Sequence, residues 1–231
     1  FAKVMHNLET DHEFHHHAAL LTLLQISDIV ERADLRSELL QELARQKLVM
    51  EALKGNPAIA SAKLESILAE IDNVVDTLRA ENTKLGQTLR NNEWLMSIKQ
   101  RTGIPGGVCE FDVPSYHYWL NLGPAKRRED ITAWIKPLLP MQQAISIILH
   151  ILRGSGAKTK LLAKAGVYQE MLSGAKPAQM LTIDVADNTA CFPEVSANKY
   201  AMNIRFIHLD HCQKTQKYEG DVKFTLTLCN L

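Results

Sequence analysis

The spacing of apolar residues changes once along this chain of 231 residues, and this change limits what the chain can fold into. Up to about residue 153, apolar side chains recur at every third or fourth position, which places them on one face of an α-helix. From about residue 166 they alternate with polar side chains, which is typical of strands with one buried face. We therefore predict an α+β fold, with an N-terminal and central α-helical domain and a C-terminal antiparallel β-sheet domain.

The helical part is expected to begin with an antiparallel hairpin of two long helices. Leu35, Leu39 and Leu43 mark one stripe of a helix over residues 28–54, and Gly55 and Pro57 end this helix. Residues 60–80 repeat the pattern after a short link, which favours an antiparallel pair. Shorter helices are predicted over residues 86–101, 130–136 and 140–153.

The segment between residues 86 and 121 is predicted to join the helical and sheet parts. The sequence Ile-Pro-Gly-Gly from Ile104 ends the preceding helix, and Pro114 argues against a central strand. Residues 108–121 are therefore expected to be extended or irregular, with Trp94 and Trp119 seating the helices on the sheet. The expected domains are a helical domain over 1–107, a junction over 108–124, helices packing between the two parts over 125–160, and a sheet domain over 161–231.

The glycine- and lysine-containing stretch 154–160 shows a faint similarity to a phosphate-binding loop. It lacks the Gly-Lys-Ser/Thr core of such loops, and a helix rather than a strand precedes it. We therefore predict a mobile basic loop and no nucleotide site.

Strands are predicted over residues 166–172, 178–186, 200–209 and 221–229. If the last two pair as a hairpin around the 210–220 loop, Lys199, Arg205 and Lys223 share one solvent-facing side. Charged residues often only keep an exposed sheet in solution. Three cations with little acid among them nevertheless form a plausible site for an acidic peptide.

The bulk composition excludes several classes of function. The formal net charge is zero, so the molecule as a whole has no strong attraction to nucleic acid or to a membrane surface. The most apolar run, residues 144–152, is much shorter than the ~20 residues needed to cross a bilayer. Four scattered cysteines without a Cys-x-x-Cys pair argue against a zinc ribbon and favour free thiols in a reducing cytoplasm.

A histidine-rich patch near the N-terminus contains a short metalloprotease-like pattern. His12, Glu13 and His16 match His-Glu-x-x-His, which places two imidazoles on one helical face. The match fixes only three positions in a run that is already rich in histidine, and the extended pattern with a third histidine is absent. A zinc-dependent hydrolase is therefore kept as an alternative only, and no metal or other cofactor is predicted.

Several long motifs resemble the ZapD family of bacterial cell division proteins. The similar stretches are RADLRSELLQELARQ, GQTLRNNEWLMSIKQR, IPGG-x-C-x-FD-x-P-x-YH-x-WL, VSANKYAMNIRF and DVKFTLTLCN, and they occur in order along nearly the whole chain. The resemblance implies a non-enzymatic, cytoplasmic protein at the mid-cell division site. It also implies a symmetric homodimer that binds the C-terminal tail of FtsZ and cross-links FtsZ filaments into bundles, supporting Z-ring assembly.

The resemblance implies that basic surface residues bind this tail. The candidate partner-binding residues are Arg205, Lys199, Lys223, Arg32, Arg36, His117, Arg90, Lys99 and Arg101. Arg32 and Arg36 could equally decorate a solvated helix face, and Arg90 could complete an ion pair. Nucleic-acid binding through the basic sheet face remains a further alternative, although no recognisable reading helix accompanies it.

Overall fold

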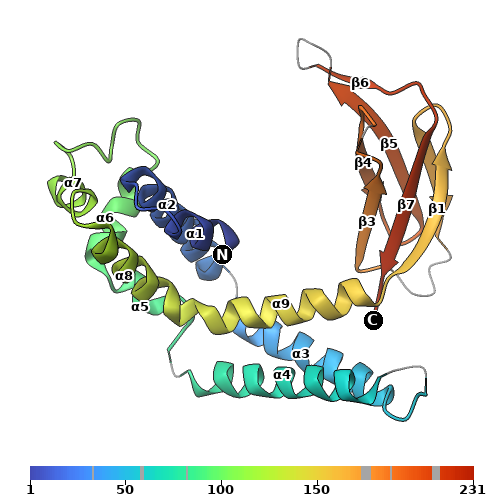
Figure 1. Cartoon of the computed structure of the whole chain (residues 1–231), viewed down its shortest axis with the longest axis horizontal. Helices are drawn as coiled ribbons and strands as arrows, with labels where there is room; N and C mark the ends of the chain where they lie inside the picture. The colour runs from blue at the N-terminus through green and yellow to red at the C-terminus, as the bar shows by residue number, and fades with distance from the viewer. Residues whose placement is uncertain (33, 58–59, 82, 173–177, 188, 210–213) are drawn as a thin grey trace. The chain divides into compact units, whose positions relative to one another are not determined.

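Helices occupy the chain up to Gly154 and strands follow from Ala157, which confirms the predicted α+β class (Figure 1). The computed structural model describes residues 1–231 except 33, 58–59, 82, 173–177, 188 and 210–213, and it leaves out the side chain of Arg32. The chain divides into two compact units, Phe1–Ile148 and Leu149–Leu231. This division falls within the last helix, whereas residues 108–124, the predicted junction, lie inside the first unit.

The first unit is built from helices that buried apolar faces hold together. The helices are α1 (Ala2–Leu8), α2 (Glu13–Arg32), α3 (Leu35–Ala52), α4 (Ser61–Ala80), α5 (Gln87–Arg90), α6 (Glu93–Arg101), α7 (Pro114–Leu120), α8 (Pro124–Ile135), the 3₁₀ turn η1 (Lys136–Leu138) and α9 (Leu139–Gly154). α3 and α4 are joined by a short link and contact each other, as expected for a hairpin, and Leu43 and Ile71 are fully buried.

The single helix predicted over residues 28–54 is wrong, because α2 ends at Arg32 and α3 begins at Leu35. Asp34 caps the new helix, since its Oδ1 accepts a hydrogen bond from the Ser37 backbone amide at 3.5 Å. An aspartate just before a helix can accept a hydrogen bond from an otherwise unpaired amide of the first turn, and it therefore favours the start of a helix at this position. Asn92 separates α5 from α6 in the same way, and its Oδ1 accepts from the Leu95 amide at 3.0 Å.

The extended conformation predicted for residues 108–121 is wrong for Pro114–Leu120, which form α7. Pro114 occupies the first turn, where a missing amide hydrogen costs nothing. Tyr116 and Trp119 of this helix stack with ring centroids 5.9 Å apart, and Trp94 lies 5.9 Å from Trp119. These aromatic rings belong to the core of the helical unit, so the expectation that Trp94 and Trp119 seat helices on the sheet is also wrong.

The run from Pro124 to Gly154 is long and apolar enough, by length and composition, to cross a membrane. A third of its most apolar segment is buried, and its residues contact other helices of the first unit. Arg127 and Arg128 of α8 donate hydrogen bonds to backbone carbonyls at the end of α1 and just after it. Gln46 of α3, which is fully buried, has its side-chain amide 3.4 Å from the Ile148 carbonyl oxygen of α9.

The second unit contains two antiparallel sheets. Among the described residues, β1 (Ala157–Ala163), β7 (Val222–Cys229) and β3 (Met180–Val185) form one sheet in that order. β2 (Val167–Met171), β5 (Ala201–Leu209) and β4 (Phe192–Ala197) form the other, and β6 (Thr215–Lys217) also pairs with β5. Ile204 and Phe206 of one sheet share a core with Phe224 and Leu226 of the other, so the two sheets pack face to face.

Two predictions about this unit are wrong. Residues 157–160, expected as a loop or as part of the helical segment 125–160, form the first half of β1. The expected hairpin of residues 200–209 with 221–229 does not form, because β5 and β7 belong to different sheets. After β5 the chain first returns along it as β6, where Thr215 pairs with Leu209, and only then enters the other sheet.

Candidate functional site

Arg36 and Arg90 lie on a common hollow of about 600 Å³ in the helical unit. Arg36 donates from Nη1 to the Glu81 carbonyl oxygen at 2.7 Å and from Nη2 to the carbonyl of Thr83. Arg90 donates from Nη2 to the Gln87 side-chain oxygen at 3.0 Å. Both guanidinium groups are thus held by neutral oxygens rather than by carboxylates, although Glu31 and Asp34 line the same hollow.

Three other predicted residues of the helical unit already have acidic partners. Lys99 Nζ lies 2.6 Å from Asp28 and 3.1 Å from Glu31, and the hydrogen bond with Asp28 raises the pKa of Lys99. Arg101 and Asp112 are 3.4 Å apart. His117 lies 3.5 Å from Glu110 and also hydrogen-bonds the Asn121 amide. Lys99 therefore ties α6 to α2, while Arg101 and His117 hold the loop between α6 and α7. The side chain of Arg32 lies outside the described part of the chain.

Arg205 projects from the outer face of the β2–β5–β4 sheet. It is exposed, while its neighbours Ile204 and Phe206 point into the core. It pairs across the strands with Val167 on one side and Glu194 on the other. Cross-strand neighbours approach to about 5 Å, so Glu194 tempers the charge of Arg205. The described part of the chain nevertheless gives Arg205 no ion pair. Lys199 lies just before the same strand, with its Nζ 4.8 Å above the Tyr200 ring.

Lys223 does not share a face with Arg205, which corrects the predicted cluster of Lys199, Arg205 and Lys223. It projects from the outer face of the β1–β7–β3 sheet, on the far side of the shared core. Two lysines that we did not predict as site residues lie on its face. Lys158 pairs with Thr227, and Lys160 pairs with Thr225, which is two residues from Lys223. All three lysines are exposed, and none forms an ion pair with a described residue.

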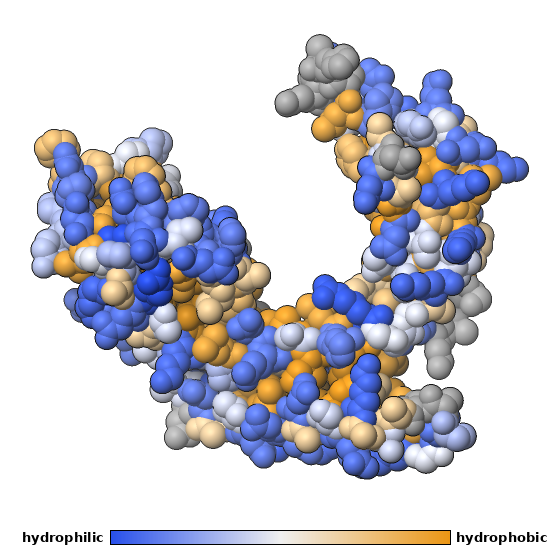
Figure 2. All heavy atoms as spheres, in the orientation of Figure 1, coloured by the Kyte–Doolittle hydropathy of each residue, from blue (hydrophilic) through white to orange (hydrophobic). Residues whose placement is uncertain are grey.

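The signal that would have revealed these lysines is the alternation in Ala157-Lys158-Thr159-Lys160. Lysines two positions apart share one face of a strand. A loop has no such regular faces, so the predicted loop over residues 154–160 did not place these lysines together. Hydrophilic and hydrophobic side chains are interspersed over the surface of this unit (Figure 2).

The histidines of the metalloprotease-like pattern do not converge. His16 is fully buried, and its Nδ1 accepts a hydrogen bond from Arg127 Nε at 2.9 Å. His12 lies outside α2, and its Nδ1 accepts from the Phe14 amide at 3.2 Å. Among the described residues, no three His, Cys, Asp or Glu side chains are grouped as metal ligands would be. Cys109, Cys191 and Cys229 are free, and Cys212 lies outside the described residues.

Arg127 organises this part of the helical unit. Besides His16, it donates to the carbonyl oxygens of Leu120 and Asp11, each at 2.7 Å, and to that of Leu122. Burial lowers the pKa of His16, and the nearby Arg127 and Arg128 lower it further. Burial also lowers the pKa of His17, whose Nδ1 is hydrogen-bonded to the Tyr116 hydroxyl. Both imidazoles therefore serve packing between α2 and its neighbours.

Comparison with known proteins gives one consistent result. Residues 1–205 match the sequence profile of the ZapD family, described as a cell division protein. The cell division protein ZapD of Aromatoleum aromaticum is 44% identical over 231 residues, which cover all of this chain and 90% of that protein. The ZapD proteins of Nitrosomonas eutropha (48% identity, 96% of this chain and 88% of the relative) and Chromobacterium violaceum (45%, 99% and 91%) are similarly close. With such coverage, this chain belongs to the ZapD family of cell division proteins.

Proposed function

We propose that this protein is a non-enzymatic cell division factor that binds the C-terminal tail of FtsZ and cross-links FtsZ filaments into bundles. Its membership of the ZapD family carries the proposal, and the resemblance of its motifs to that family implies this partner. The protein would act in the cytoplasm at the division site, where bundling supports the Z-ring.

Cations without a carboxylate partner among the described residues are the best supported contacts for the tail. On the sheet unit these are the exposed Arg205, Lys199 and Lys223, and on the helical unit they are the half-buried Arg36 and Arg90, which line a hollow. Lys99 contributes less, because Asp28 and Glu31 already neutralise it. Arg101 and His117 contribute only if their acidic neighbours Asp112 and Glu110 are displaced.

Cross-linking requires at least two copies of one binding site. A symmetric homodimer provides them, because the same surface occurs on both subunits. Each contact can be weak, since a filament presents many tails and the second binding event is effectively intramolecular. Weak ionic contacts also keep bundling reversible.

Light scattering of FtsZ polymerising with GTP tests the proposal. The wild-type protein should raise the scattering, and Arg205→Glu should reduce that rise while the thermal unfolding midpoint stays the same. Lys63→Glu is the matched control, because it changes the net charge equally at an exposed position of α4. No rise with the wild type would refute the function, whereas an undiminished rise with Arg205→Glu would refute the site alone.

A further inference from the structure

The first strand of the sheet unit has an open edge. β1 is the outermost strand of the β1–β7–β3 sheet, and the described residues make no backbone hydrogen bond along its outward side. Residues 157–160 are all exposed. An edge of this kind presents unpaired amide and carbonyl groups that can accept another extended chain.

The side chains on this edge are positively charged, so they favour an acidic partner chain. Lys158 and Lys160 alternate along β1 on the outer face, and Lys223 of β7 is the diagonal neighbour of Lys160. A second copy of β1 would bring lysine against lysine, so the same residues discourage self-pairing. A strand with acidic side chains at alternate positions would instead meet two or three cations, none of which has an ion pair among the described residues.

An apolar residue continues the same face. Leu162 follows Lys160 by two positions and keeps 41% of its surface exposed. It pairs with Lys223, and both line a hollow of about 710 Å³ together with Lys160, Thr225 and Asp184. The edge thus offers two positive positions followed by one apolar position, at the two-residue spacing of an added strand.

We propose that the β1 edge binds an extended acidic peptide by strand addition, with acidic side chains beside Lys158 and Lys160 and an apolar side chain beside Leu162. The backbone ladder would supply affinity, and the alternating side chains would supply specificity. A peptide fits this site better than a nucleic acid, because only a peptide backbone can pair with the open edge. The inference specifies a binding mode and a sequence pattern, and it stands whether or not FtsZ is the partner.

Fluorescence anisotropy with the full chain tests the inference. The probes are labelled peptides Glu-Thr-Glu-Thr-Val and, for the opposite strand direction, Val-Thr-Glu-Thr-Glu. The control probe has the same composition with adjacent acids, Glu-Glu-Thr-Thr-Val. We expect at least one alternating peptide to bind at least about fivefold more tightly than the control, because only alternate side chains share a face.

The protein variants distinguish binding at the β1 edge from a general effect of net charge. Lys158→Glu/Lys160→Glu should weaken the alternating peptide about tenfold, whereas Lys63→Glu/Lys217→Glu, with the same change in net charge at exposed positions, should not. The first variant should instead gain affinity for Lys-Thr-Lys-Thr-Val, which also shows that it is folded.

Four results would count against the proposal. One is equal affinity for the alternating and adjacent peptides. Another is unchanged binding by Lys158→Glu/Lys160→Glu. The third is no binding by any peptide, which would leave the lysines as protection of a free edge. Full displacement of the peptide by an oligothymidylate, with equal affinity, would favour a nucleic-acid surface and also count against strand addition.

Discussion

At the scale of single residues, the surroundings of a charge decide what it can do. Lys99 and Arg205 are both cations in family-like motifs, and the sequence alone does not separate them. Lys99 lies between two carboxylates, whereas Arg205 faces solvent from β5, whose buried residues line the core. Ionic partners so far apart in sequence, such as Lys99 with Asp28 and Glu31, could not be identified before the fold was known.

Arg127 is the residue whose loss should most affect the helical unit. It is buried and donates to His16 and to three backbone carbonyls. Replacing it with methionine keeps much of the volume but leaves these acceptors without a donor. We expect Arg127→Met to lower the free energy of unfolding by about 3 kcal/mol in urea titrations. A loss below about 0.5 kcal/mol would show that the network contributes little.

The buried histidines should make the protein less stable in mild acid. The pKa values of His16 and His17 are both lowered in the folded chain, so the unfolded chain takes up protons first. Stability is therefore complete above the unfolded value of about 6.5 and falls as the pH drops below it, by at most about 1.4 kcal/mol per pH unit for each histidine. Urea unfolding at pH 7.5 and 5.5 measures this loss, and His16→Gln should make it smaller. Equal losses in both proteins would contradict the assignment to His16.

At the scale of elements, the sequence predicted those with strong periodicity and missed those decided by tertiary pairing. α4 and strands β2, β3, β5 and β7 lie where the apolar pattern places them. β1, β4 and β6 were missed because most of their residues are small or polar, so few large apolar side chains mark an inward face. The pairing of β5 and β7 was wrong because neighbours in sequence need not be neighbours in a sheet. The basic sheet surface was consequently predicted as one face, whereas the structure has two.

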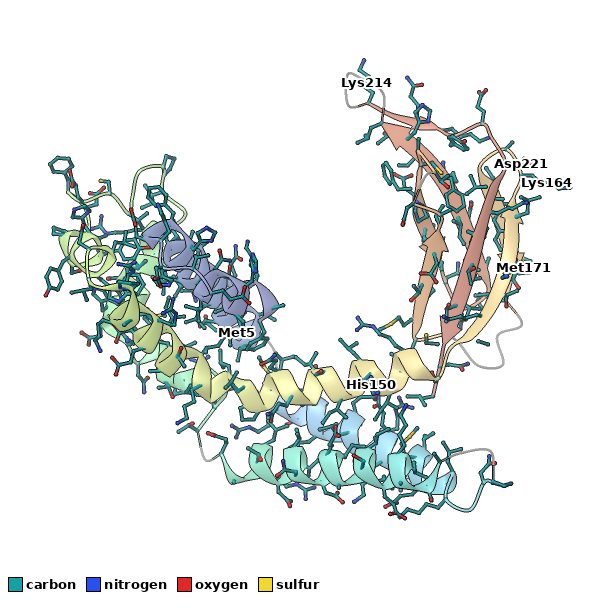
Figure 3. All side chains as sticks on the ribbon, viewed as in Figure 1. Met5, His150, Lys164, Met171, Lys214 and Asp221 are labelled. Carbon is teal, nitrogen blue, oxygen red and sulfur yellow. The ribbon has the colours of Figure 1, made fainter. Side chains whose placement is uncertain are left out.

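The turn between β1 and β2 should tolerate almost no change. Gly166 has φ of +69°, and a Cβ there would overlap the Tyr218 carbonyl group. The Ala165 amide donates to Asp221 at 2.9 Å, and Figure 3 shows Asp221 and Lys164 together at this end of the sheets. We expect Gly166→Ala to lower the free energy of unfolding by more than about 2 kcal/mol.

Gly154→Ala is the matched control for this prediction. Gly154 ends α9 with open space around it, and its replacement should change stability by less than about 1 kcal/mol. Equal thermal unfolding midpoints for the two variants would show that the turn at Gly166 is not constrained as described.

At the scale of the whole molecule, the local basic surfaces predict a strong effect of salt on binding, although the net charge is zero. The proposed contacts lie on exposed side chains, where the screening length falls from about 30 Å at 0.01 M to about 8 Å at 0.15 M salt. FtsZ bundling should therefore decline steeply as potassium chloride rises from 50 to 300 mM, while the circular dichroism spectrum stays constant. Bundling that is insensitive to salt would point to an apolar contact instead.

Sedimentation of FtsZ polymers with and without their C-terminal tail tests the central claim most directly. The claim is that this ZapD-family protein bundles filaments by binding that tail through its exposed basic residues. With GTP and the wild-type protein, full-length FtsZ should pellet as bundles at low speed together with the protein, and tailless FtsZ should remain in the supernatant. Equal pelleting of both forms of FtsZ, or of neither, would contradict the account.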